Sequence, residues 1–116
     1  MKPVALATRI EVAQGQALVY AEGDVDLESS AALRQALSTA LASSDSVTVD
    51  VADVGFIDSS GLSVLVWGHG RAQESGGSLR LRRPSPMLRR LLEITSLDSV
   101  LAIADSEDHD RAASES

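Results

Sequence analysis

Near its centre the chain reads Val47-Thr48-Val49-Asp50-Val51-Ala52-Asp53-Val54-Gly55-Phe56-Ile57-Asp58-Ser59-Ser60-Gly61-Leu62. The valines at alternate positions at the start of this run are typical of a β-strand. A helix is predicted from about Ser60 to Glu74, where the glycines of Ser75-Gly76-Gly77 end it. A strand that enters a helix through a short polar loop is the repeating unit of an α/β sheet.

A hairpin and another helix are predicted before this unit. Leu6, Thr8, Ile10 and Val12 stand at alternate positions, as in a half-buried strand, and a second strand is predicted at 17–21. Gly15 in the turn 14–16 between them can take a positive φ. Residues 23–26 are predicted to form a polar loop. Leucines spaced four apart then predict a helix over about 28–42.

A shorter strand, a third helix and a last strand are predicted after it. Leucines mark a strand at 79–81, and Ser85 is a suitable N-cap for a helix that Pro86 begins. A last strand is predicted at 100–103. Residues 1–104 are therefore expected to form one α/β domain, a mixed sheet of four to five strands with about three helices packed on it. Residues 105–116 are expected to be a disordered acidic tail.

The composition narrows the class of function. The chain has 116 residues, a net charge of −7 and no cysteine. The negative charge argues against direct binding to nucleic acid or to an anionic membrane surface, and it opposes self-association, so we expect a monomer. Without cysteine there is no disulfide or thiolate zinc site, and no apolar run approaches the length of about 18 residues that suggests a membrane span. A cytoplasmic protein is the simplest expectation.

The motifs together resemble those of STAS domains, and especially those of bacterial anti-sigma factor antagonists. The resemblance rests on Asp58-Ser59-Ser60-Gly61-Leu62 after a strand, on Gly23-Asp24-Val25-Asp26 followed by Ser29, and on Thr95-Ser96-Leu97-Asp98 after the third helix. It covers nearly the whole domain and implies the STAS fold. It also implies that Ser59 is phosphorylated by an anti-sigma factor that is a serine kinase. By the same resemblance, the unphosphorylated form is expected to bind that factor and free the sigma factor, and a phosphatase is expected to reset the switch.

Three residues depart from the usual family pattern. Asp24 replaces the commoner Glu, and Ser29 replaces the commoner Thr, and both preserve the chemistry. Ser96 stands where Gly is usual. If that position has a left-handed backbone, a residue other than Gly costs roughly 1 kcal/mol.

Each residue near the switch also has a purely structural interpretation. Ser59 or Ser60 can cap the second helix. With the resemblance, Ser59 is interpreted as the switch and Ser60 as its cap or support, and Gly61 as a point of close backbone approach. Asp58 either stabilises the positive end of the helix or orients Ser59 for the kinase.

The remaining candidate residues are assigned to partner binding. Asp24 and Asp26 are too few for a metal site, so they are expected to line the rim of the binding surface with Ser29, unless Asp26 caps the first helix. Val64 and Trp67 fall on a second stripe of the second helix. This stripe is either covered by neighbouring helices or forms a ridge that faces the partner.

Three hypotheses for function follow. The first is the phosphorylation-gated binding module described above, which needs no cofactor or metal. The second is a STAS adaptor subunit of a lipid-transport or stress-sensing assembly, in which Ser59 is never modified. The third, an enzyme that uses Ser59 as a nucleophile, ranks far lower because the sequence places no histidine beside it and lacks a Gly-x-Ser-x-Gly motif.

Overall fold

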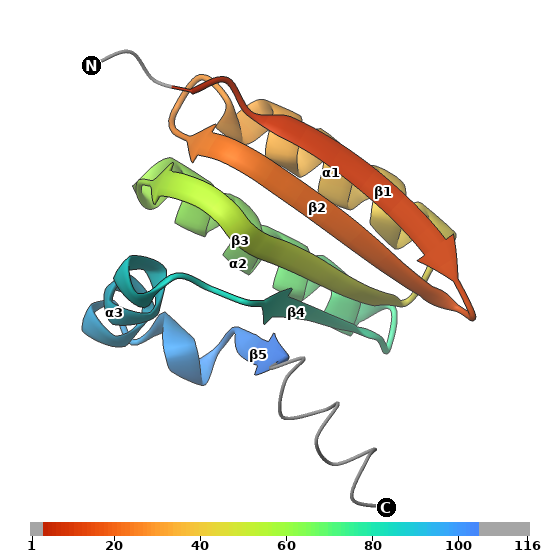
Figure 1. Cartoon of the computed structure of the whole chain (residues 1–116). Coiled ribbons are helices and arrows are strands. Elements are labelled where there is room, and N and C mark those ends of the chain that lie inside the picture. Colours follow the sequence, from red (N-terminus) through yellow and green to blue (C-terminus); the bar gives the residue numbers. More distant parts are fainter. Residues whose placement is uncertain (1–3, 105–116) are drawn as a thin grey trace, which may run out of the picture.

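The computed structural model describes residues 4–104, which form a mixed five-stranded sheet with helices (Figure 1). The strands are β1 (Ala7–Ala13), β2 (Gln16–Val25), β3 (Ser46–Ile57), β4 (Ser78–Arg82) and β5 (Ala102–Ala104). The helices are α1 (Ser30–Ser43), α2 (Ser59–Glu74) and α3 (Pro86–Ile94), followed by a 3-10 turn at Leu97–Ser99. The predicted α/β class and element order are confirmed.

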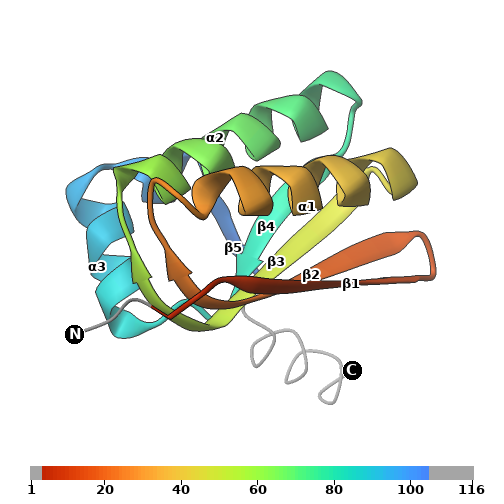
Figure 2. The same cartoon turned by 90° about the horizontal axis from the view of Figure 1, so that it is seen from above.

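The strands lie in sequence order across the sheet, from β1 at one edge to β5 at the other. β1 and β2 are antiparallel, and the remaining neighbours are parallel. Figure 2 shows α1 and α2 side by side on one face, as right-handed crossovers between successive parallel strands require. The core of buried Leu, Val, Ile and Ala lies between this face and the helices.

Two strands extend further than predicted. β2 continues through Gly23, which was assigned to a polar loop, because its φ of 113° accommodates a shift in register with β3. A side chain at Gly23 would collide with the carbonyl oxygen of Ala5. β3 continues past Val51 because a second shift lets Val54 and Ile57 return to the buried face.

Local backbone geometry confirms several sequence interpretations. Gly15 has a φ of 77° in the two-residue hairpin turn between β1 and β2. The hydroxyl of Ser85 accepts a hydrogen bond of 3.1 Å from the N–H of Leu88, so it caps α3. Ser96 has a φ of 62°, the left-handed geometry that the resemblance to a family glycine suggested.

None of the helices in residues 4–104 is long and apolar enough to cross a membrane. The last strand begins at Ala102, later than expected, because the 3-10 turn after Ser96 takes up the preceding residues. The tail that was predicted to be disordered, 105–116, lies outside the described residues.

Candidate functional site

The two motifs that carry the resemblance meet at the carboxyl ends of β2 and β3. Val25 pairs with Ile57 as the last residues of these parallel strands. One residue further on, the N–H of Asp58 donates a hydrogen bond of 3.1 Å to the carbonyl of Val25. The loop that begins at Asp26 and the start of α2 at Ser59 are therefore neighbours. Carboxyl ends of parallel strands are common ligand and partner sites in α/β proteins.

Asp58, and not a serine, caps α2. Its Oδ1 accepts hydrogen bonds from the N–H of Ser60 at 2.9 Å and of Gly61 at 3.4 Å. The interpretation of Ser60 as the cap is therefore wrong, because Asp58 occupies the N-cap position and its side chain already satisfies these donors. Ser59 is the first residue of the helix and is exposed. The hydroxyl of Ser59 is therefore not needed to cap α2.

We expect Asp58→Ala to lower the free energy of unfolding by about 1 kcal/mol, as the loss of an N-cap does. Ser60→Ala is the matched control, and it should change the stability by less than half of that amount. Urea unfolding followed by circular dichroism measures both. An equal loss in the two variants would restore the serine as a contributor to the cap.

Gly61 allows the first turn of α2 to rest directly on the sheet, as predicted. A Cβ at this position would lie 2.6 Å from Cγ1 of both Ile57 and Val25. Gly61 is itself buried. Packing this close fixes the start of α2, and with it Ser59, against the ends of β2 and β3.

Gly61→Ala is expected to destabilise the domain by about 1–3 kcal/mol, the usual cost of overpacking a core. Gly70→Ala is the control on the same helix, because a Cβ there has no atom within 4 Å. That substitution should be neutral or stabilising, since alanine has the higher helix propensity. Thermal unfolding of both variants distinguishes the close approach from a general effect of alanine in α2.

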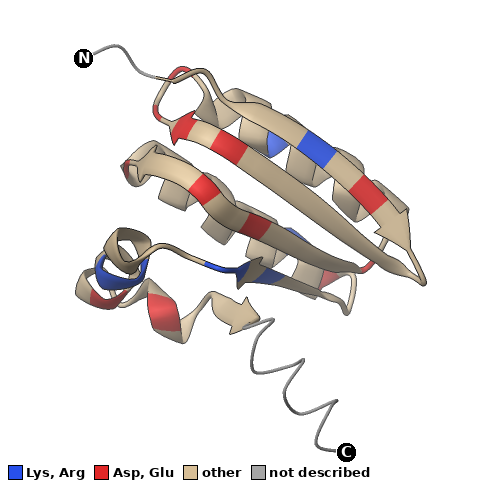
Figure 3. Cartoon of the chain, viewed as in Figure 1, with Lys and Arg blue, Asp and Glu red and all other residues tan. Residues whose placement is uncertain are grey.

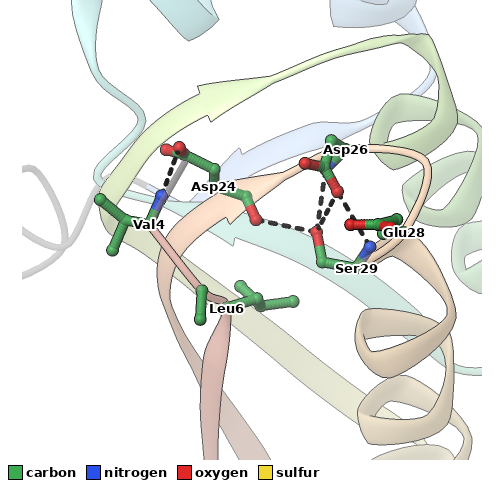
Figure 4. A pocket seen from close by; sticks show the side chains of 7 residues that line it. Val4, Leu6, Asp24, Asp26, Glu28 and Ser29 are labelled. Carbon is green, nitrogen blue, oxygen red and sulfur yellow. Dashed lines mark hydrogen bonds between the residues drawn. The ribbon is translucent and has the colours of Figure 1, made fainter. Parts of the chain in front are cut away.

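Asp26 and Ser29 bind each other reciprocally and shape the loop into α1 (Figure 4). Asp26 Oδ1 accepts from the N–H of Ser29 at 3.0 Å, and Ser29 Oγ accepts from the N–H of Asp26 at 2.9 Å. The hydroxyl of Ser29 also donates to the carbonyl of Asp24 at 2.8 Å. Hydrogen bonds from the backbone and hydroxyl of Ser29 lower the pKa of Asp26. Asp26 therefore holds the loop before α1 but does not cap the helix, because the N-cap position is Ser29 and no side chain accepts a capping hydrogen bond there.

Asp24 lies at the mouth of a hollow between β2 and the chain before β1. Its Oδ2 accepts a hydrogen bond of 2.9 Å from the N–H of Val4. The hollow is lined by Val4, Ala5, Leu6, Asp24, Asp26, Glu28 and Ser29. Three of these are acidic, and Figure 3 shows red residues along this end of β2 and the following loop. Over residues 4–104, no cluster of side chains has the composition of a metal site.

The sequence interpretation missed two exposed apolar residues near the carboxyl ends of β2 and β3. Leu27 is 77% exposed between Asp26 and Glu28, and Phe56 is 47% exposed beside Asp24 in the β2–β3 pairing. Single exposed apolar residues are common on protein surfaces, and these two are of interest because each is next to a residue of the candidate site. The sequence did offer a signal for Leu27, because it is the one apolar residue between the acidic residues Asp26 and Glu28. Phe56 follows a break in the alternation of β3, which hid its orientation.

The second stripe of α2 does not form a free ridge. Val64 is only 8% exposed and belongs to the core, so its assignment to partner binding is wrong. Trp67 is half-buried, and the guanidinium of Arg34 on α1 lies 4.3 Å from the centre of its ring. The stripe is covered because α1 packs alongside α2 on the same face of the sheet (Figure 2).

A buried carboxylate on the opposite face of the sheet was not identified from the sequence. Asp50 on β3 is 3% exposed, and its Oδ2 accepts hydrogen bonds from Arg82 Nε at 2.9 Å and Arg83 Nη2 at 2.7 Å. Its Oδ1 accepts from the N–H of Ala52 at 3.0 Å. Burial by itself raises the pKa of Asp50. The hydrogen bonds and the positive charge of Arg82 lower the pKa by more than burial raises it, so the net shift is downward.

Comparison with known proteins places this arrangement in a family. The family model described as "Mlab, STAS domain" matches residues 9–103. The anti-sigma-B factor antagonist of Bacillus subtilis is 33% identical over 82 residues, which cover 71% of this chain and 75% of the relative.

Solved structures of similar fold include other anti-sigma factor antagonists. One from Mycobacterium paratuberculosis has a TM-score of 0.76 at 25% identity and covers 93% of both chains. SpoIIAA in its unphosphorylated form has a TM-score of 0.74 at 22% identity, covering 93% of this chain and 97% of that one. SpoIIAA of Bacillus in its phosphorylated form has a TM-score of 0.69 at 22% identity, covering 91% and 99%. The chain therefore belongs to the STAS domain family and is related to the anti-sigma factor antagonists within it.

Proposed function

We propose that this protein is an anti-sigma factor antagonist controlled by phosphorylation of Ser59. The unphosphorylated form binds an anti-sigma factor of the serine kinase type and releases the sigma factor. Phosphorylation by that kinase ends binding, and a phosphatase restores it. The protein acts in the cytoplasm by binding, without a cofactor and without catalysis of its own.

The single observation that carries this proposal is the position of Ser59. It is exposed at the first turn of α2, and Asp58 has already taken up the N–H groups that a serine would otherwise cap. The hydroxyl is therefore open to a kinase at no cost to the helix. The 33% identity to the anti-sigma-B factor antagonist supports the same role.

The surface around Ser59 suits a protein partner. The acidic residues Asp24 and Asp26 lie on the neighbouring strand end, with the exposed Leu27 between Asp26 and Glu28. An apolar side chain within a charged rim is a common arrangement of protein interfaces. Ser29 would support partner binding by holding this loop in shape and not by touching the partner, because its hydroxyl is already hydrogen-bonded to Asp24 and Asp26.

Affinity capture from a lysate of the source organism tests the proposal. Tagged wild-type protein and Ser59→Ala should both retain a serine kinase, identified by mass spectrometry, and the Ser59→Ala variant should retain more of it. Incubation of the captured kinase with ATP should phosphorylate the wild type and leave Ser59→Ala unmodified. Ser63→Ala is the matched control, because Ser63 is exposed one turn further along α2.

The adaptor hypothesis makes a different prediction for the same experiment. An adaptor subunit would retain components of a transport or stress-sensing assembly, and the Ser59→Ala variant would retain them equally. Capture of such an assembly without any kinase, from cells in which Ser59 is unmodified, would overturn the switch.

A further inference from the structure

β1 leaves one of its two edges unpaired within the part of the chain that the structure describes. It pairs with β2 on one side and is the outermost strand of the sheet (Figure 1). All of its residues are exposed except Ile10, which is half-buried. Val12 is 53% exposed, a large fraction for an apolar residue within a strand. An exposed edge of this length is a template for pairing with another strand.

The hairpin turn determines which backbone groups face this edge. Ala13 and Gln16 flank a two-residue turn, and such residues exchange hydrogen bonds with each other. Because hydrogen-bonded pairs alternate along an antiparallel ladder, Glu11 and Arg9 also direct their backbone groups toward β2. The N–H and C=O groups of Thr8, Ile10 and Val12 therefore point outward, and no strand within residues 4–104 pairs with them.

The sequence of β1 is complementary to itself when it is reversed about Ile10. In an antiparallel pair centred there, Ile10 meets Ile10 of a second copy, and Thr8 meets Val12, a side chain of nearly the same shape. Arg9 meets Glu11, so two opposite-charge pairs form. These pairs fall at positions without hydrogen bonds, where opposite side chains come closest.

We propose that two copies of this chain associate through β1 in this register, joining their sheets into one. The contact is isologous, so the Arg9–Glu11 and Thr8–Val12 pairs each occur twice, while the Ile10 pair lies on the twofold axis and occurs once. Arg9 and Glu11 are 65% and 56% exposed and bridge each other along the strand at 3.4 Å. In the dimer each of them exchanges this partner for the oppositely charged residue of the second copy.

This dimer replaces the monomer expected from the net charge of −7. Repulsion between two negatively charged copies weakens association. The β1 edge nevertheless offers backbone hydrogen bonds and opposite-charge pairs, which the net charge of the chain does not show. β3, which leads to Ser59, is separated from the edge by β2. Pairing through β1 therefore leaves both copies of Ser59 exposed, and the dimer presents two of them.

Charge reversal at the two central positions tests the register. In Arg9→Glu, carboxylates would face each other across the dimer, and in Glu11→Arg guanidinium groups would do so. Sedimentation velocity of the full chain up to about 1 mM should show a concentration-dependent dimer for wild type. Each single variant should associate at least tenfold more weakly than wild type.

Mixing the two variants is the decisive arm of the experiment. A heterodimer of Arg9→Glu with Glu11→Arg restores opposite charges at both positions, so the mixture should sediment like wild type. Circular dichroism checks that each variant is folded, as expected from the exposure of both side chains. A wild type that stays monomeric up to the highest concentration would overturn the proposal. So would a wild-type dimer that both single variants preserve.

Discussion

Phosphorylation of Ser59 is expected to weaken binding to the anti-sigma partner by at least about two orders of magnitude without unfolding the domain. A phosphoserine adds about −1.5 to −2 charges at neutral pH. The phosphate would lie at the carboxyl ends of β2 and β3, where Asp24, Asp26 and Asp58 already carry negative charge. The partner must then accommodate a dianion on a surface that had met a neutral hydroxyl.

The fold survives because the local electrostatic effects are small and opposed. The positive end of α2 stabilises a nearby anion by about 0.3–1 kcal/mol. The adjacent carboxylate of Asp58 acts in the opposite direction, and it retains its own hydrogen bonds to Ser60 and Gly61. The melting temperature of the phosphorylated protein should therefore remain close to that of the unmodified protein.

Phosphorylation is expected to change the free energy of partner binding by more than it changes the free energy of unfolding. A charge left unmatched at an interface, or set against a like charge, costs several kcal/mol. Because each tenfold change in affinity corresponds to about 1.4 kcal/mol, a loss of about 3 kcal/mol already gives two orders of magnitude. Ser59→Ala should bind at all times, and Ser59→Asp should bind weakly. Competition binding of these variants against wild type measures the difference, with Ser63→Ala expected to compete as wild type does.

Asp50→Ala is expected to lower the free energy of unfolding by about 3 kcal/mol, the lower part of the range for breaking a buried ion pair. The side chain of Asp50 is 3% exposed, whereas the side chains of Arg82 and Arg83 are 25% and 52% exposed. Removal of the carboxylate leaves both guanidinium groups without their shared partner, and their access to water limits the loss. Urea unfolding at neutral pH measures it.

Asp53→Ala is the matched control, because Asp53 lies on the same strand and is exposed. Substitutions of this kind usually change stability by less than about 0.5 kcal/mol. Equal losses for Asp50→Ala and Asp53→Ala would show that the buried cluster contributes nothing beyond an ordinary surface charge.

The contribution of Asp50 should depend on pH in a defined direction. Its pKa in the folded protein lies below the usual value of an aspartate, because its hydrogen bonds and the charge of Arg82 outweigh the effect of burial. A lowered pKa means that the unfolded chain binds the proton more tightly, so the stabilisation is fully present above the unfolded value of about 3.9. It is lost as the pH falls through the lower folded value. The difference between wild type and Asp50→Ala should therefore be constant near neutrality and shrink below about pH 4.

The sequence predicted those parts of the fold that depend on local patterns. Alternating valines, the hairpin glycine and the cap at Ser85 each report on a few neighbouring residues, and all three were confirmed. The glycine that usually stands at position 96 left a left-handed conformation open there, and the structure has one at Ser96. The mixed sheet followed from the order of the elements, because strands joined through helices become parallel neighbours and the opening hairpin is antiparallel.

The parts that failed depend on contacts between distant segments. Val64 was assigned to a free surface because periodicity cannot show that α1 packs on α2. Asp50 looked like an ordinary polar residue in a strand, since its partners lie more than thirty residues away. The cap of α2 was given to a serine because several suitable residues stand together, and only the backbone geometry selects Asp58.

Titration calorimetry with the captured kinase is the most direct test of the proposed switch. The kinase is titrated with purified protein in its unphosphorylated form and then with protein phosphorylated on Ser59, under the same buffer and salt conditions. Binding by the unphosphorylated form and an affinity at least about a hundredfold weaker for the phosphorylated form are predicted. Equal affinity of the two forms would contradict the switch and leave the adaptor role as the better account.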